Sequence, residues 1–412
     1  MPVLPDGEPA PSDGSLPNPD VSGGLAAYVH IPFCSVRCGY CDFNTYTNLD
    51  FGPGASVADF PDSLEREIAL SERVLTGVGE EPQLTSVFFG GGTPTMLATE
   101  QLVAVLERLD QAFGLVPGAE VTTEANPESV TRDSLQRLRD GGFTRVSFGM
   151  QSAVPEVLQI LDRQHRPEQV PKAVAWAREV GLDVSVDLIY GAPGETDDQW
   201  RASVEAAIAM NPDHISAYAL TVEPGTKMGA QVRRGELSLP DPDEQADRYE
   251  IVDSLLHAAG YQWYEISNWA KPGHECQHNL MYWHRGDWWG YGPGAHSQIG
   301  GTRFWNVKHP LAYAQRLEGG QLDDDGAAVV SPAAGREVLS ESERAEEDVM
   351  LGIRLAEGIE VPRGVSSAVV AGFIADGLVV PAVALRGRLV LTLKGRLLAD
   401  TVTRKLWDAQ DL

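Results

Sequence analysis

Short apolar segments alternate with longer amphipathic segments from residue 25 to about residue 220. The short segments are rich in β-branched and aromatic residues, which is typical of buried strands. The longer ones repeat apolar residues every three or four positions and often begin at Thr or Asp, which predicts capped helices. The strand-like segments span residues 26–32, 86–91, 120–126, 145–151, 183–191 and 214–221, and the clearest helical ones span 61–75, 99–113, 131–141 and 196–210. This alternation predicts a parallel sheet with crossover helices.

The predicted fold is therefore of the α/β class. Six strand–helix units are fewer than the eight of a closed barrel, so we expect a partial (β/α)6 barrel of the TIM type. Polar residues gather where the strand-like segments end, and in such folds the active site lies at the carboxyl ends of the strands. These strand-end residues are HIPFC at 30–34, GGGTPT at 90–95, Glu124, Asn126, Gln151, Asp187, Thr221 and Glu223. The sequence thus predicts a functional site at one rim of the barrel.

Other segments flank this core, which we place at residues 25–320. The first twenty residues hold six prolines and no Lys or Arg, so residues 1–24 are expected to be a disordered lead-in rather than a secretory signal. Residues 262–306 are rich in Trp, Tyr, His and Gly. The Gly, Ala and Asp content of residues 321–340 predicts a linker. Residues 341–412 have the pattern of a small α+β, winged-helix-like domain, and their slightly acidic charge favours packing over DNA binding.

The charge of the chain limits the partners that it can bind. Its net charge is −27 at pH 7, which argues against nucleic acid and against an anionic membrane surface. No apolar run approaches the roughly 18 residues that a transmembrane helix needs. We therefore expect a cytoplasmic protein with no transmembrane segment.

Three of the four cysteines, Cys34, Cys38 and Cys41, lie in one short segment with the spacing C-x3-C-x2-C. Clustered thiols in a reducing compartment bind metal or perform redox chemistry more often than they form disulfides. Thiolates suit zinc or an iron–sulfur cluster, but a structural zinc site needs a fourth protein ligand, which this segment lacks. Three thiolates on a four-iron cluster leave one iron open to a small molecule. The spacing therefore favours an iron–sulfur cluster over zinc.

The stretch YVHIPFCSVRCGYCDFN at residues 28–44 resembles the signature of radical S-adenosylmethionine (SAM) proteins. The version Y-x-H-I-P-F-C is similar to that of oxygen-independent coproporphyrinogen III oxidases and of their haem-chaperone relatives, the HemW-like proteins. The likeness extends from residue 25 to residue 412, so residues 341–412 would form the C-terminal domain of the HemN type.

The resemblance implies a [4Fe–4S] cluster on Cys34, Cys38 and Cys41, with the amino and carboxylate groups of SAM on the open iron. GGGTPT matches the family's second motif, whose backbone approaches this end of SAM, and glycine permits so close an approach. In this superfamily the reduced cluster passes an electron to SAM and cleaves it. By the same resemblance, the residues that contact SAM are Tyr28, Tyr40, Gly91, Gly92, Thr93, Glu124, Gln151, Arg163, Asp187 and Ala219.

Two features favour the haem chaperones over the oxidases. The oxidases continue the signature with a fourth cysteine, where this chain has Phe43, as the chaperones do. The stretch HNLMYW at 278–283 matches the HNxxYW motif of the chaperones, which is associated with haem binding. The resemblance thus implies a haem chaperone that delivers haem to recipient haem proteins, including membrane-bound ones. A coproporphyrinogen III oxidase is the alternative, and a radical enzyme with another substrate is a third possibility.

His278 is the candidate ligand of the haem iron, since neutral imidazole is a normal axial ligand. His274, His284 and His296 are also close in sequence and remain alternatives. The aromatic residues Tyr282, Trp283, Trp288 and Trp289 would either cover a porphyrin face or pack in a core. Cys276 would be a second ligand or, as we slightly favour, an inert buried thiol.

Overall fold

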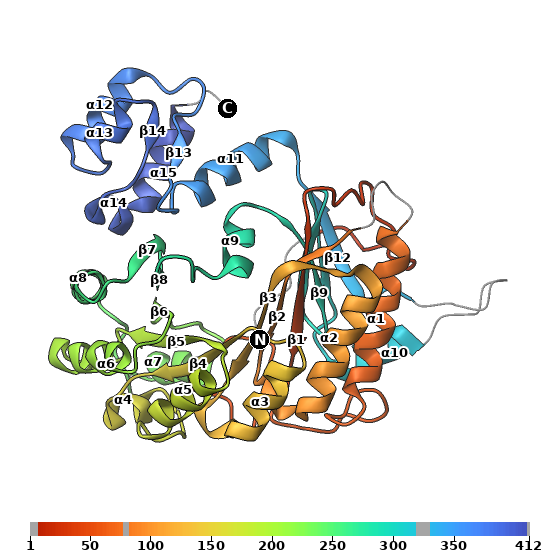
Figure 1. Cartoon of the computed structure of the whole chain (residues 1–412). Helices are drawn as coiled ribbons and strands as arrows, with labels where there is room; N and C mark the ends of the chain where they lie inside the picture. The colour runs from red at the N-terminus through yellow and green to blue at the C-terminus, as the bar shows by residue number, and fades with distance from the viewer. Residues whose placement is uncertain (1–6, 77–81, 319–329, 410–412) are drawn as a thin grey trace.

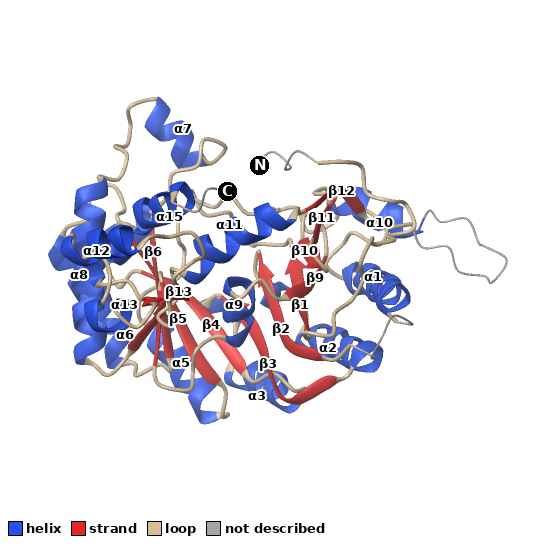
Figure 2. Ribbon diagram, turned by 90° about the horizontal axis from the view of Figure 1, so that it is seen from above, coloured by secondary structure: helices blue, strands red, loops and turns tan. Residues whose placement is uncertain are grey.

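The structure, a computed structural model, describes residues 7–76, 82–318 and 330–409. Six strands that follow one another in the chain are also neighbours in the sheet and run parallel in an open arc (Figure 2). They are β1 (Leu25–Ile31), β2 (Leu84–Gly91), β3 (Leu115–Ala125), β4 (Arg145–Gln151), β5 (Asp183–Tyr190) and β6 (His214–Ala219). The six expected strands and the partial barrel are confirmed.

Helices cover the outer face of this arc (Figure 1). They are α1 (Phe60–Leu75), α2 (Thr99–Phe113), α3 (Arg132–Asp140), α4 (Pro155–Ile160), α5 (Gln169–Glu179) and α6 (Asp197–Ala209), followed by α7 (Lys227–Arg233) and α8 (Pro242–Ala258). Alternating side chains explain the two faces of the sheet: Val146 and Phe148 of β4 are fully buried in the core, whereas Ser147 and Gln151 line the inside of the arc. None of the described helices is long and apolar enough to cross a membrane.

Two of the expected Thr caps are present. The Thr131 hydroxyl accepts a hydrogen bond from the Ser134 N–H (3.1 Å) at the start of α3, and the Thr196 hydroxyl accepts one from Gln199 (3.3 Å) at the start of α6. Helix α2 instead begins after Ala98, whose N–H donates to the Gln101 side chain (2.9 Å). The polar residues before these helices therefore fix where the chain leaves the sheet.

The sheet continues beyond both edges of the six-stranded arc. Beyond β1, β9 (Asp287–Tyr291) is parallel to it, and β10 (His296–Ile299), β11 (Thr302–Asn306) and β12 (Ala333–Val338) follow as antiparallel strands. Beyond β6, β8 (Asn268–Ala270) and β7 (Gln262–Glu265) are antiparallel. Residues 271–286, with α9 (Gln277–Trp283), connect β8 at one edge to β9 at the other (Figure 1). The aromatic segment thus extends the barrel wall at both edges.

Two segments differ from what their composition predicts. In the described part of the expected disordered lead-in, residues 7–24, Glu8 exchanges two backbone hydrogen bonds with Arg336 (2.9 and 2.8 Å), and Val21 is buried in the core. The expected linker contains β12, which pairs with β11, while its residues 321–329 lie outside the described residues. Backbone pairing stabilises both segments because it depends little on side-chain type.

The C-terminal residues form a small α+β unit with its own apolar core. It contains α11 (Glu341–Gly352), β13 (Ile359–Glu360), α12 (Ser367–Ala375), α13 (Pro381–Ala384), β14 (Arg388–Leu389), α14 (Leu393–Leu397) and α15 (Ala399–Asp408). Arg396 fastens this unit to the barrel: its guanidinium binds both carboxylate oxygens of Asp253 on α8 (2.7 and 2.8 Å) and lies 4.4 Å from the Trp263 ring centroid. The pair is mostly buried, so losing either partner would leave a poorly compensated charge between the unit and the barrel.

A buried carboxylate on α1 ties β9–β11 to the barrel. Glu67 accepts hydrogen bonds from the Gly292 N–H (2.8 Å) and the Asn306 amide (2.7 Å), and burial raises its pKa to about 7. Gly292 belongs to the loop between β9 and β10. This loop is held on its other side by Asn44, whose amide donates to the carbonyl of Pro293 (2.8 Å). Asn44 belongs to the loop that follows the cysteines, so these contacts position that loop.

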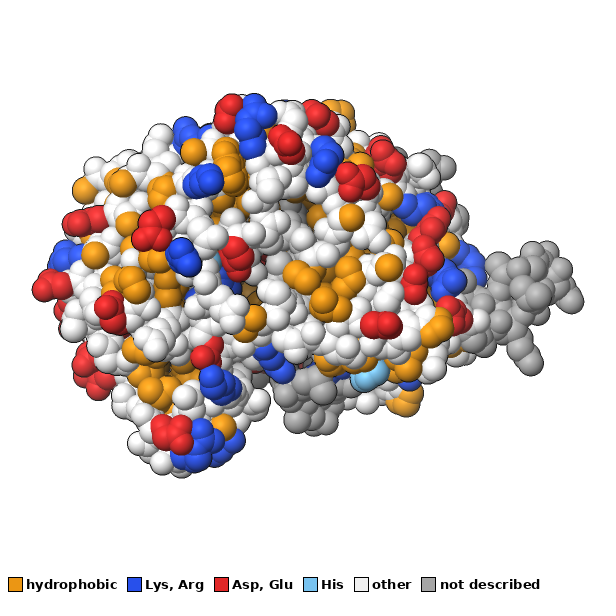
Figure 3. Space-filling model, turned by 90° about the horizontal axis from the view of Figure 1, so that it is seen from below, with side chains coloured by type: hydrophobic (Ala, Val, Ile, Leu, Met, Phe, Trp, Pro, Cys, Tyr) orange, Lys and Arg blue, Asp and Glu red, His pale blue; other side chains and the backbone are white. Residues whose placement is uncertain are grey.

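Acidic and basic side chains are interspersed over the face of the molecule drawn in Figure 3. The chain as a whole is strongly acidic, with a net charge of −27. That face therefore lacks the broad basic surface with which proteins bind nucleic-acid backbones.

Candidate functional site

The three clustered cysteines lie in the loop after β1. Cys34 is buried, and Cys38 and Cys41 are half-buried. The Thr93 hydroxyl donates to the Cys34 sulfur (3.8 Å), and the Arg163 guanidinium donates to the Cys38 sulfur (3.5 Å). Burial raises the pKa of Cys34 to about 11 and raises that of Cys41. A cationic centre would be needed to hold these thiols ionised.

The arrangement of the thiols bears on the kind of metal centre. Among the described residues, no three His, Cys, Asp or Glu side chains are grouped closely enough to hold a single metal ion. All three thiols nevertheless line the wall of one cavity. A cubane holds its cysteine ligands farther apart than one zinc ion does, because each sulfur binds a different iron. The donor set therefore fits a [4Fe–4S] cluster better than zinc.

The glycine stretch at the end of β2 lies against the cysteine loop. The Gly92 and Thr93 N–H groups donate to the carbonyls of Ile31 and Phe33 (both 2.8 Å). A Cβ atom at Gly92 would lie 2.6 Å from the Phe33 carbonyl and 3.0 Å from the Cys34 sulfur. Gly91 has φ +103°, which disfavours any side chain. Only glycine lets this backbone approach the thiols so closely.

Two half-buried carboxyl groups follow on β3 and β5. Glu124 accepts a hydrogen bond from the Gly91 N–H (3.1 Å), and Asp187 accepts one from the Ser147 hydroxyl (2.8 Å). Burial raises the pKa of Glu124 to about 8, with the negative Asp187 adding to the rise, and burial also raises the pKa of Asp187. A cationic ligand placed between the two carboxyl groups would lower both of their pKa values. The ligand would in turn bind more tightly to the ionised carboxylates than to the protonated acids.

Arg163 joins the cysteine loop to the end of β4. Its Nη2 donates to Asn126 (2.8 Å) and to the Gly149 carbonyl (2.9 Å), while its buried Nε has no hydrogen-bond partner among the residues that the structure describes. The last residue of β4, Gln151, has φ +62°, a backbone conformation that is uncommon for residues other than glycine. Such backbone strain is concentrated at functional sites.

One cavity of about 620 Å³ unites the residues predicted from the sequence. Its wall contains all fourteen of them: Tyr28, Cys34, Cys38, Tyr40, Cys41, Gly91, Gly92, Thr93, Glu124, Gln151, Arg163, Asp187, Ala219 and His278. Phe43, which stands where the oxidases have a fourth cysteine, also lines this cavity and is 56% exposed. His274, His284 and His296 lie outside its wall. The structure thus brings residues from all six strands together with the cysteine loop.

His278 is deeply buried, with 1% of its surface exposed. Its Nδ1 is hydrogen-bonded to the Ser86 hydroxyl and its Nε2 to the Tyr282 hydroxyl (both 2.9 Å), and its ring stacks on Phe88. Burial lowers its pKa to about 3, so the imidazole is neutral. To bind an iron it would have to give up one of these hydrogen bonds, whereas His296 is exposed and stacks on Trp305.

The aromatic residues of the same segment divide between core and cavity. Trp289 is buried and packs on Phe304, as a core residue does. Tyr282 lines the cavity, and its ring contacts that of Trp288 edge-on. Trp283 and Trp288 are half-buried.

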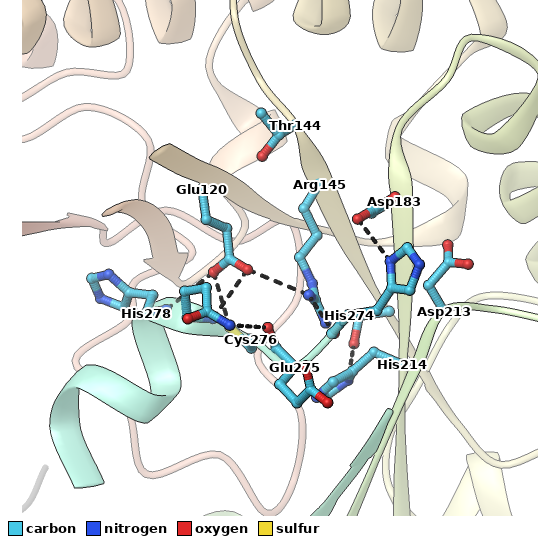
Figure 4. A network of polar contacts seen from close by, with 12 residues as sticks. Glu120, Thr144, Arg145, Asp183, Asp213, His214, His274, Glu275, Cys276 and His278 are labelled. Carbon is cyan, nitrogen blue, oxygen red and sulfur yellow. Dashed lines mark hydrogen bonds and ion pairs between the residues drawn. The ribbon is translucent and has the colours of Figure 1, made fainter. Parts of the chain in front are cut away.

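Sequence reasoning missed a polar network at the opposite end of the cavity (Figure 4). Glu120 accepts hydrogen bonds from the Cys276 thiol (3.2 Å) and the His278 N–H (3.1 Å), and it lies 3.4 Å from the Arg145 guanidinium. Burial raises the pKa of Cys276 to about 12, so this thiol is protonated, in agreement with an inert role. Arg145 is the first residue of β4 and Glu120 is the middle residue of β3, so neither lies at the end of its strand. The sequence signal that could have identified these two residues is the two-residue alternation of a strand, which places them on the inner face of the sheet.

Comparison with known proteins identifies the family of the chain. A model described as the radical SAM superfamily matches residues 28–207. The haem chaperone HemW of Mycobacterium tuberculosis is 48% identical over 402 residues, which are 97% of this chain and 98% of that protein. The haem chaperone HemW of Bacillus subtilis is 36% identical over 342 residues, which are 82% of this chain and 85% of that protein.

A solved structure shares the fold. The coproporphyrinogen III oxidase HemN of Escherichia coli, a radical SAM enzyme, matches with a TM-score of 0.77 at 24% identity, over 97% of this chain and 92% of that chain. The match includes the C-terminal unit. Radical SAM proteins as a family use SAM and a [4Fe–4S] cluster. Because its near-full-length relatives are HemW proteins and its thiol loop and strand ends are consistent with them, the chain belongs to the HemW family of haem chaperones within the radical SAM superfamily.

Proposed function

We propose that this protein binds haem and passes it to recipient haem proteins, while Cys34, Cys38 and Cys41 hold a [4Fe–4S] cluster. The observation that carries the proposal is the common cavity, in which the three thiols face the glycine stretch and the acidic strand ends. The near-full-length relatives named as haem chaperones supply the haem part. Recipients in a membrane are part of the same proposal.

The residues of the cavity fit SAM as the second group. Gly91, Gly92 and Thr93 offer a close backbone for the amino-acid end, and Arg163 adds a positive charge beside Cys38. Glu124 and Asp187 provide negative charge for a sulfonium. Tyr28, Tyr40, Gln151 and Ala219 complete the wall in this proposal. When bound, the cluster supplies one electron for the reduction of SAM.

A coproporphyrinogen oxidase is the alternative because the fold is shared with HemN. Phe43 speaks against it, since it replaces the fourth cysteine of the oxidases by an exposed aromatic ring. A single anaerobic sample tests both functions. The cluster is reconstituted, and haem titration and coproporphyrinogen turnover are then measured on the same protein. Stoichiometric haem binding without turnover supports the chaperone, and turnover to protoporphyrinogen would overturn it.

The haem ligand can be assigned by a matched pair of variants. His278→Ala removes a buried imidazole whose two nitrogens are already hydrogen-bonded, and His296→Ala removes an exposed one. A Soret band that shifts with His278→Ala, and not with His296→Ala, assigns the iron to His278 and implies release of Tyr282. The opposite result moves the ligand to the exposed histidine.

A further inference from the structure

Two buried polar atoms at the end of the cavity far from the cysteines have no partner within the described residues. One is Nη2 of Arg145, on the first residue of β4. The other is the hydroxyl of Thr122, which lies directly opposite Arg145 in the register of β3 and β4. Both residues line the cavity, and both are almost fully buried, at 3% and 1% exposure. A buried donor without an acceptor is unfavourable, so these two atoms point to a missing acceptor.

The positive charge of Arg145 is only partly neutralised by the protein. Its Nη1 donates to the His274 carbonyl (3.0 Å) and lies 3.4 Å from the Glu120 carboxylate (Figure 4). Glu120 meanwhile accepts hydrogen bonds from Cys276 and from two backbone N–H groups at the start of α9. A guanidinium binds a carboxylate best through two parallel N–H groups, and this one keeps a nitrogen free.

The remaining walls of the cavity combine aromatic rings with the polar side chains of Ser185, Ser216, Asn268 and Asn279 and with the carboxylate of Asp187. Phe88, Tyr264 and Tyr282 line it, and His214 is hydrogen-bonded through both ring nitrogens to Ser185 (2.7 Å) and Tyr264 (2.8 Å). Burial holds the pKa of His214 well below its usual value, so it carries no charge. The compartment thus offers the Arg145 guanidinium and the Thr122 hydroxyl beside aromatic rings and neutral polar groups, which suits an acid with a largely apolar body.

This end is separate from the place proposed for SAM. Arg145 and Gln151 are the first and last residues of β4, which at 3.3 Å per residue puts them about 20 Å apart. Arg163, the basic residue beside the cysteines, donates to Asn126 and Gly149 at the far end of the strand. Arg145 therefore cannot serve the carboxylate of a SAM molecule bound at the cysteine loop.

We propose that Arg145 and Thr122 form a carboxylate-binding subsite, which takes either a small aromatic or aliphatic acid or a propionate side chain of a porphyrin. The proposal deepens the proposed function and rests on it, because SAM and the cluster would occupy the other end of the same cavity. One carboxylate oxygen accepts from Nη2 of Arg145, and the other accepts from the Thr122 hydroxyl. The aromatic rings hold the body of the ligand.

The first test uses benzoate as the free acid and benzamide as its neutral counterpart. Calorimetry on the cluster-reconstituted full chain with saturating SAM is expected to show binding of benzoate and not of benzamide. Thr122→Val keeps the shape and removes one donor, so it should weaken benzoate about tenfold. Thr123→Val is the matched control, because Thr123 does not line the cavity and donates to the Glu124 carbonyl instead. Equal loss in both variants would overturn the assignment.

The second test separates the source of the carboxylate. Haem and its dimethyl ester are titrated into the wild-type protein and Thr122→Val. A preference for free haem that disappears in Thr122→Val identifies a propionate, and unchanged haem binding together with benzoate binding identifies a small acid. Arg145→Gln, if it folds by circular dichroism, should weaken the acid on the order of 100-fold.

The subsite and the proposed function fail in different ways. If neither benzoate nor a haem carboxylate binds, or if SAM displaces benzoate competitively, the subsite does not exist. Haem and SAM titrations of the wild-type protein would still succeed in that case. If those titrations fail while benzoate binds, the proposed function is wrong and the subsite stands.

Discussion

Glu124 makes the binding of SAM depend on pH in a predictable direction. Its carboxyl is half-buried beside Asp187, which raises its pKa to about 8. SAM carries a fixed positive charge on its sulfonium, so it binds better when Glu124 is ionised. Raising the pH through this pKa therefore strengthens binding, which then levels off above it. The ionised fraction is about 1% at pH 6 and about half at pH 8, so the apparent affinity gains at most about 50-fold, which is reached if only the ionised form binds SAM.

The assay is calorimetric titration of SAM into cluster-reconstituted protein at pH 6, 7, 8 and 9. Glu124→Gln keeps the shape and removes the titrating group, so its profile should be flatter than that of the wild type. The amino group of SAM titrates in both proteins and is cancelled by the comparison. A flat wild-type profile, or an equally steep profile in Glu124→Gln, would refute the role assigned to this carboxyl.

Three further predictions concern the cluster, the haem and the C-terminal unit. Cys38→Ala should lose the iron, the sulfide and the brown absorbance of the cluster while circular dichroism stays unchanged, and Cys276→Ala should keep them; full iron in the first variant would contradict the ligand set. His278→Ala should weaken haem binding, which an unchanged Soret titration would disprove. Arg396→Met removes the cationic partner of Asp253, which keeps the hydrogen bond from the Trp269 indole (3.0 Å), and should lower the free energy of unfolding in urea by up to about 3–5 kcal/mol, whereas adding Asp253→Leu should recover part of the loss. A single variant as stable as the wild type would show that the C-terminal unit is not held by this pair.

The sequence predicts the core of the fold and the end of the cavity at the cysteine loop because both depend on local signals. Each of the strands β1 to β6 is a β-rich run between amphipathic segments, and carboxyl ends of parallel strands meet at one edge. Glu124 and Gln151 follow from that rule without knowledge of any contact, whereas Asp187, predicted at the end of its strand, lies three residues before the end of β5. The cysteine spacing adds the thiols, since three ligands on one loop can face a common centre.

The end of the cavity at Arg145 and the strands beyond β1 and β6 could not be predicted in the same way. Arg145 and Thr122 stand before the strand ends, and only the pairing of β3 with β4 reveals that they are opposite each other. β12 has the composition of a linker, because an edge strand is stabilised through backbone pairing. The two hydrogen bonds of His278 depend on Ser86 and Tyr282, whose partners no sequence pattern indicates.

Residues 271–286 covalently connect the two margins of the open barrel, because they run from β8, beside β6, to β9, beside β1. Neither margin can swing outward without stretching this tether or pulling α9 off Glu120. Outward movement of either margin would therefore also disturb the polar network of Glu120 and Arg145. The exposed ring of Phe43 lines the same cavity, so a planar guest that enters beside the cysteine loop would contact this ring.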